Sequence, residues 1–98
     1  MYITNLTHYL DPDGKIAMEM PKSARELASF QSLVVDEATK DVQPPTLATE
    51  LRCRNKKCKG IIEVEFDGDV IEWWCIDCNE AGRISGWQGS KWDNRNRI

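Results

Sequence analysis

Apolar and polar positions alternate at the start of the chain and then change to a helical repeat. The run MYITNLTHYL, residues 1–10, places β-branched and aromatic residues in rough alternation, which predicts a strand. The turn-forming run DPDG ends this strand, and residues 15–20 are predicted to form a short second one. Apolar residues recur at helical spacing over the helix predicted for residues 23–39: Leu27, Phe30, Val34 and Ala38.

The start of this helix carries its own signal. Ser23 and Glu26 have the spacing of a capping box, in which each side chain accepts a hydrogen bond from a free amide of the first turn. The apolar stripe can serve a partner protein or pack on the chain's own sheet, and packing on the sheet is the more common use of such a stripe.

Two adjacent prolines follow the predicted helix, within the run TKDVQPPTLATE. Proline cannot continue a helix and favours an extended chain, so residues 41–50 are predicted to be a linker. The linker would separate an N-terminal unit, residues 1–40, from a C-terminal unit, residues 51–98.

A second alternation, GIIEVEFDGDVIEWWC, predicts a β-hairpin whose two-residue turn is Asp67-Gly68. One face is predicted to be apolar and carries Ile62, Val64, Phe66, Ile71, Trp73 and Cys75. The other face carries Ile61, Glu63, Glu65, Val70, Glu72 and Trp74. In this register Glu63 opposes Glu72, so either the register is different or a cation lies nearby. A third strand is predicted over residues 83–87.

All four cysteines flank this hairpin in two close pairs, Cys53-x₄-Cys58 and Cys75-x₂-Cys78. Each pair can offer two thiolates from one tight turn, and the hairpin returns the second turn to the first. Four cysteines are a closed tetrahedral set for zinc, so the sequence predicts one zinc ion per chain. Iron in the same four-sulfur cage is the alternative.

This frame resembles the zinc ribbon, or rubredoxin-like, group. The resemblance rests on Cys53-x₄-Cys58-x-Gly60, the hairpin, and Cys75-x₂-Cys78 followed by Gly82. It covers about residues 51–88 and implies a three-stranded antiparallel sheet with two zinc knuckles that grip one metal. Many knuckles of the group have two residues between their cysteines, whereas the first knuckle here has four. The whole chain is also similar to short bacterial proteins of no assigned function.

The expected fold class is therefore a small α+β protein, with N-terminal strands and one amphipathic helix before a C-terminal zinc ribbon. The chain has 98 residues and a net charge of −3, which suits one small domain. It has no apolar run long enough to span a bilayer, and its start lacks the features of a signal peptide. These observations predict a cytoplasmic protein without a membrane partner, and the reducing cytoplasm disfavours disulfides between the cysteines.

Catalysis is not expected. Four cysteines fill every position of a tetrahedral zinc, so none remains for water or a substrate. His8 is the single histidine, and no neighbouring residue completes a catalytic or metal motif with it. The sequence also indicates no small-molecule substrate. A zinc ribbon occurs in transcription factors, ribosomal proteins, polymerase subunits and accessory domains, so the fold alone does not give a function.

Two binding surfaces remain, with nearly equal support. The nucleic-acid candidate combines cations around the first cysteine pair with a basic, aromatic segment near the end: Arg52, Arg54, Lys56, Lys57, Lys59, Trp87, Lys91 and Trp92. These cations can instead offset the negative charge of a zinc–thiolate centre, and the tryptophans can instead be core residues. The protein-binding candidate is Trp74 with Ile61 and Val70, surrounded by glutamates that suit a basic partner. The same face would equally suit burial beneath the N-terminal helix.

Overall fold

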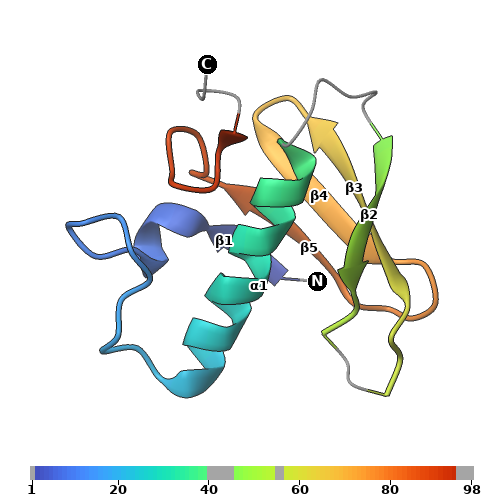
Figure 1. Cartoon of the computed structure of the whole chain (residues 1–98), viewed down its shortest axis with the longest axis horizontal. Coiled ribbons are helices and arrows are strands. Elements are labelled where there is room, and N and C mark those ends of the chain that lie inside the picture. The colour runs from blue at the N-terminus through green and yellow to red at the C-terminus, as the bar shows by residue number, and fades with distance from the viewer. Residues whose placement is uncertain (1, 40–45, 55–56, 95–98) are drawn as a thin grey trace.

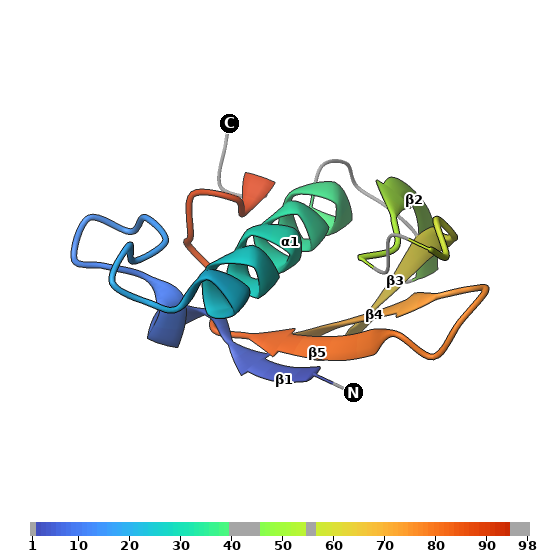
Figure 2. The same cartoon turned by 90° about the horizontal axis from the view of Figure 1, so that it is seen from below.

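One helix, α1 (Lys22–Ala38), lies across one face of a curled five-stranded sheet (Figures 1 and 2). The structure is a computed structural model and describes residues 2–39, 46–54 and 57–94. The strands are β1 (Tyr2–Asn5), β2 (Thr46–Arg52), β3 (Ile61–Asp67), β4 (Val70–Cys75) and β5 (Ala81–Ser85), and a short 3₁₀ helix, η1 (Leu6–Tyr9), follows β1. The sheet order is β1-β5-β4-β3-β2, and only the β1–β5 pair is parallel.

The small α+β class is confirmed, but the predicted three-stranded antiparallel ribbon is wrong, because the hairpin and β5 belong to a larger mixed sheet. β1 from the predicted N-terminal unit pairs with β5, placing Tyr2 beside Gly82. β2 begins inside the predicted linker, of which residues 41–45 lie outside the described part of the chain. Both additions are pairings between distant segments, which local alternation cannot reveal.

The hairpin has the predicted faces but a different turn. Asp67 pairs with Val70, so the two loop residues are Gly68 and Asp69, with Gly68 at a φ of 59°. Each residue of β3 therefore pairs with a β4 residue two positions away from its predicted partner. A shift of two positions leaves every side chain on its predicted face. Glu65 rather than Glu63 now opposes Glu72.

The predicted cation beside these glutamates is Arg83, which neighbours Glu72 across β4 and β5. Its guanidinium forms ion pairs with Glu72 and, at 3.1 Å, with Asp67. Arg83 therefore relieves the repulsion between Glu65 and Glu72 that the hairpin pairing creates.

Trp73 is the centre of the core between the sheet and α1, and only 1% of it is exposed. Phe30 of α1 meets its ring edge-on at a centroid distance of 5.0 Å, and Tyr2 of β1 stacks at 6.2 Å. Gly82 lies under the indole, where a Cβ atom would come within 2.5 Å of the ring nitrogen. The helix thus packs on the chain's own sheet, as the more common use of its stripe predicts.

The ends of α1 differ from the prediction. The helix begins at Lys22 with Pro21 as its N-cap, and no side chain caps it, so the Ser23–Glu26 capping box is wrong. At the other end Asn94 donates its side-chain amide to the Asp36 carbonyl oxygen at 2.9 Å. The same amide reaches the Asp36 carboxylate at 2.8 Å, so the chain after β5 returns to hold the end of the helix.

The first ten residues form less strand than predicted. The side chain of Asn5 accepts a hydrogen bond from the Thr7 amide at 3.1 Å, which turns the chain into η1. His8 is exposed on this 3₁₀ helix. The second predicted strand is reduced to one bridge between Leu10 and Ile16. Among the described helices, none has the length and apolar character needed to cross a membrane.

Candidate metal centre

The fold brings all four cysteine sulfurs together at one end of the sheet. Every Sγ atom lies within 4.8 Å of the other three. Cys53 and Cys78 are 3.6 Å apart, and Cys58 and Cys75 are 3.5 Å apart. A tetrahedral metal with sulfur ligands at about 2.3 Å separates its sulfurs by about 3.8 Å. A disulfide would need about 2.0 Å, so the spacing matches a metal site and no pair is bonded.

Each cysteine pair sits in a loop that a backbone hydrogen bond closes. The first knuckle, residues 53–60, follows β2, and the amide of Cys53 donates to the carbonyl of Gly60 at 2.8 Å. The second knuckle, residues 75–80, joins β4 to β5, and the amide of Cys75 donates to the carbonyl of Glu80 at 2.9 Å. The four-residue spacing of the first pair therefore still allows a closed loop.

Backbone amides point at the sulfurs. The amide of Asp77 donates to Cys75 Sγ at 3.4 Å, and the amide of Glu80 donates to Cys78 Sγ at 3.5 Å. In both cases the donor lies two residues after the cysteine. Such donors stabilise thiolates, which are the form that binds a metal.

The pKa values of two thiols move in opposite directions. Burial raises the pKa of Cys75, but the Asp77 amide and the other three thiols outweigh it, so this pKa is lowered. The Gly60 amide lowers the pKa of Cys58, but the thiols of Cys75 and Cys78 together with burial raise it overall. These directions favour the thiolate form at Cys75 over Cys58, whose thiol lies 3.5 Å away and can donate a hydrogen bond to it.

Gly60 is required where the two knuckles meet. A Cβ atom at this position would come within 2.7 Å of both Cys75 Sγ and Asp77 Oδ2. Lys59, directly before it, has a φ of 54°, in the left-handed region. The first knuckle thus ends in a tight turn that leaves room for a sulfur of the second.

The cations predicted to surround the first pair do not all face solvent. Arg52, Lys57 and Lys59 are exposed, whereas Lys56 lies outside the described residues. Arg54 is half-buried, and its guanidinium lies over the rings of Tyr2 at 5.2 Å and Phe30 at 5.9 Å.

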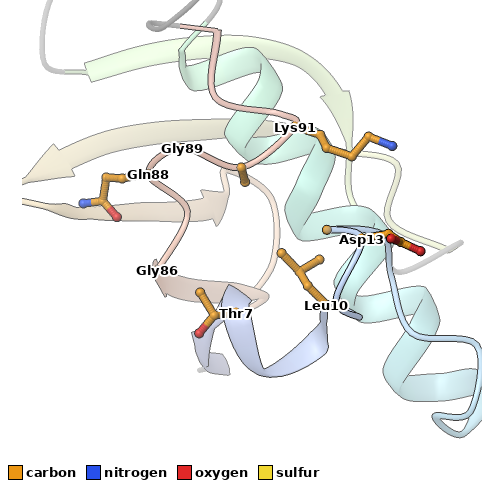
Figure 3. A pocket seen from close by; sticks show the side chains of 9 residues that line it. Thr7, Leu10, Asp13, Gly86, Gln88, Gly89 and Lys91 are labelled. Atoms are coloured by element: carbon orange, nitrogen blue, oxygen red, sulfur yellow. The ribbon is translucent and has the colours of Figure 1, made fainter.

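The remaining members of the predicted nucleic-acid set lie elsewhere. Trp87 is 1% exposed and donates its indole N–H to the Asp69 carbonyl at 2.9 Å, so its ring is not available to stack on a base. Trp92 is half-buried against the core. Lys91 lines a hollow of about 310 Å³ between the loop after η1 and the loop after β5 (Figure 3). In both cartoon views the loop after β5, which contains Lys91, and the two knuckles lie on opposite sides of the molecule (Figures 1 and 2).

The predicted protein-binding residues share one surface. Ile61, Val70 and Trp74 are half-buried on the face of the sheet that points away from α1. The indole N–H of Trp74 donates to Glu63 Oε1 at 3.0 Å. The alternative that α1 buries Trp74 is wrong, since Trp73 occupies that position.

Sequence reasoning missed Ile76 as a neighbour of this face. Ile76 lies between the ligands of the second knuckle and is 52% exposed, and its amide donates to the Ile61 carbonyl at 3.1 Å. An apolar residue between two closely spaced cysteines was the available signal. No protein-family model, curated protein or solved structure matches the chain.

Proposed function

We propose that Cys53, Cys58, Cys75 and Cys78 bind one structural zinc ion, and that the protein is a non-enzymatic binding module. The observation that carries the metal site is the four-sulfur cluster, with every Sγ within 4.8 Å of the others. Four thiolates saturate a tetrahedral zinc, so the ion would have no open position for a substrate.

The place of the site in the fold supports a structural role. The first knuckle connects the β2 edge of the sheet to β3, and the second connects β4 to β5. A metal held by both knuckles therefore joins four neighbouring strands at one end. In zinc-finger peptides such binding supplies on the order of 10–16 kcal/mol of apparent free energy at neutral pH.

Metal analysis tests the proposal. Protein purified under reducing conditions is expected to carry about one zinc per chain by elemental analysis and native mass spectrometry. Cys58→Ser and Cys78→Ser should lose the ion, because each removes a ligand. Asn79→Ser, an exposed non-ligand in the same knuckle, should keep it. Iron in its place would give a coloured protein, and a metal-free protein with intact disulfides would contradict the proposal.

Nucleic acid is one candidate partner of this module, and the observation in its favour is the group of exposed cations at the first knuckle, Arg52, Lys57 and Lys59. Three phosphate contacts would give a log–log salt slope of about −3 on duplex DNA. The double variant Arg52→Ala with Lys57→Ala should reduce this slope by about two units and keep zinc bound. Lys15→Ala with Lys22→Ala, two exposed cations on other elements, is the charge-matched control. A flat titration of zinc-loaded protein at low salt would remove nucleic acid as a partner.

A further inference from the structure

The face of the sheet opposite α1 is open. Figure 2 shows α1 and the loop after β5 on one side of the sheet, and below β5 it shows β1, the edge strand of the same sheet. Strand alternation places Ile3 of β1 on this face beside Arg83, and Ile3 is 82% exposed. We call this surface the open face.

Apolar side chains gather at the knuckle end of the open face. Trp74 on β4 pairs with Glu63 on one side and with Ala81 on the other. Ile61 and Ile76 adjoin it at the knuckle end, joined by their backbone hydrogen bond of 3.1 Å. A half-buried indole with neighbouring aliphatic residues is typical of the centre of a protein-binding surface.

Carboxylates lie beside these apolar residues, on the side toward the hairpin turn. The open face carries Glu63, Glu65, Asp67 and Glu72 against two cations, Arg83 and Arg52, the latter paired with Ile61, so the formal charge of these described residues is four negative and two positive, or −2. Arg83 is occupied by Glu72 and Asp67. Glu65 forms no ion pair with any described residue, and Glu63 is bound to the uncharged Trp74 indole. The carboxylates therefore outnumber the cations on the open face in the described part of the chain.

We infer that the open face docks a basic polypeptide segment of a partner protein, with lysines or arginines on the carboxylates and an apolar side chain against Trp74. This inference rests on the proposed role as a binding module and names the partner. A phosphate backbone would be repelled by the same carboxylates. Two copies related by a two-fold axis would also place like charges against each other.

Nuclear magnetic resonance of the zinc-loaded chain can test this assignment, because each tryptophan gives its own indole N–H signal. The probes are a lysine-rich peptide with two central leucines, a matched peptide with serines in their place, and oligothymidylate. The leucine peptide is expected to shift the Trp74 indole signal and to bind about tenfold more tightly than the serine peptide. The buried indoles of Trp73 and Trp87 should move little.

Two variants locate the site. Glu65→Lys should lower the affinity for the leucine peptide by about tenfold at low salt, because it replaces a carboxylate that forms no ion pair with a described residue by a positive charge. Trp74→Ala should weaken it by a similar factor, and Glu19→Lys, a charge-matched exposed control in the loop before α1, should leave the affinity unchanged. Peptide shifts confined to the knuckles, equal affinity for both peptides, or shifts of Trp74 by oligothymidylate would overturn the inference. So would concentration-dependent shifts of Trp74 without peptide, which indicate a second copy.

Zinc content is measured on each sample by mass spectrometry, so the two proposals can fail separately. A zinc-loaded chain that ignores the leucine peptide overturns the docking inference alone. A chain that never binds zinc overturns the proposed metal site, whatever the peptides do.

Discussion

At the scale of single residues, Gly60 decides how closely the two knuckles can approach. Its α-carbon faces Cys75 Sγ and the Asp77 carboxylate, and both would lie 2.7 Å from an added Cβ atom. One of these atoms is the sulfur of a proposed ligand, and Asp77 supplies the amide that donates to it. A side chain at residue 60 would therefore move a ligand and its hydrogen-bond donor together.

Gly60→Ala is expected to lower metal affinity by about 10- to 100-fold, as changes around a metal's ligands commonly do. The measurement is competition with a chromophoric chelator under reducing conditions. Gly14→Ala is the matched control, because Gly14 has a φ of 79° and no atom within 4 Å of an added Cβ. The control should lose some stability through backbone strain while its metal affinity stays unchanged. Equal affinities for the two variants would show that the knuckles can separate without cost.

At the scale of elements, the end of α1 depends on the segment after β5. Thr39 donates its hydroxyl to the Val35 carbonyl at 2.7 Å, and the Asn94 amide nitrogen donates to that hydroxyl at 3.0 Å. With the two bonds from Asn94 to Asp36, these contacts satisfy backbone groups that the helix end leaves open. The helix is thus anchored at its C-terminal end, whereas no side chain caps its start.

Asn94→Ala should reduce the free energy of unfolding by about 1–2 kcal/mol, because its side chain makes both bonds to Asp36. Asn94→Asp should reduce the free energy of unfolding further, since a carboxylate cannot donate a hydrogen bond and would be repelled by the Asp36 carboxylate. In thermal unfolding each kcal/mol corresponds to about 4–8 °C in a domain of this size. Ser29→Ala, an exposed site on the same helix, should leave Tm nearly unchanged. An Asp variant as stable as wild type would contradict this account of the helix end.

Elements with a clear local period were the ones that the sequence could predict. The helical repeat around Phe30 and the alternation through Ile71 each encode a buried face, and the structure confirms both faces. The spacing of the cysteines predicted the cluster, because a hairpin brings its two ends together whatever its exact turn. The position of that turn was less certain in the sequence, since Asp67, Gly68 and Asp69 all favour turns.

Other features depend on contacts between distant segments, and the sequence pattern did not contain them. The β1–β5 pairing joins the two ends of the described chain, and a four-residue strand has too short a pattern to indicate its partner. The sequence allowed Trp87 either to stack on a base beside the basic tail or to join the core, and in the structure its ring is buried while the hairpin turn accepts its indole N–H. Arg54 looked like a phosphate contact, but two rings from β1 and α1 meet its guanidinium.

At the scale of the whole molecule, strands from both of the predicted units belong to one sheet. β1 adds to the same sheet as the knuckle strands, and α1 covers Trp73, which lies two residues before Cys75, a proposed metal ligand. Trp73 is in contact with the helix, with β1 and with β5. Unfolding of the knuckles is therefore expected to unfold the helix as well.

Chelation is expected to unfold the helix and the sheet in one transition. The measurements are far-ultraviolet circular dichroism for α1 and near-ultraviolet dichroism for the packed indoles, both followed against metal content. Coincident curves are expected, because α1 shares one hydrophobic core with the strands that carry both knuckles. A helical signal that persists after all metal has left would show instead that the N-terminal segments fold independently.

The pairing of Tyr2 with Gly82 also sets an order of events while the chain is being made. β1 emerges early and has no strand partner in the described sheet until β5 has been synthesised. The hairpin and its cysteines come together over much shorter loops, which close at a lower entropic cost. The knuckle end of the sheet can therefore assemble first, and β1 joins last beside β5. Until that step, Ile3 and Tyr2 belong to a nascent segment open to chaperones and to premature association.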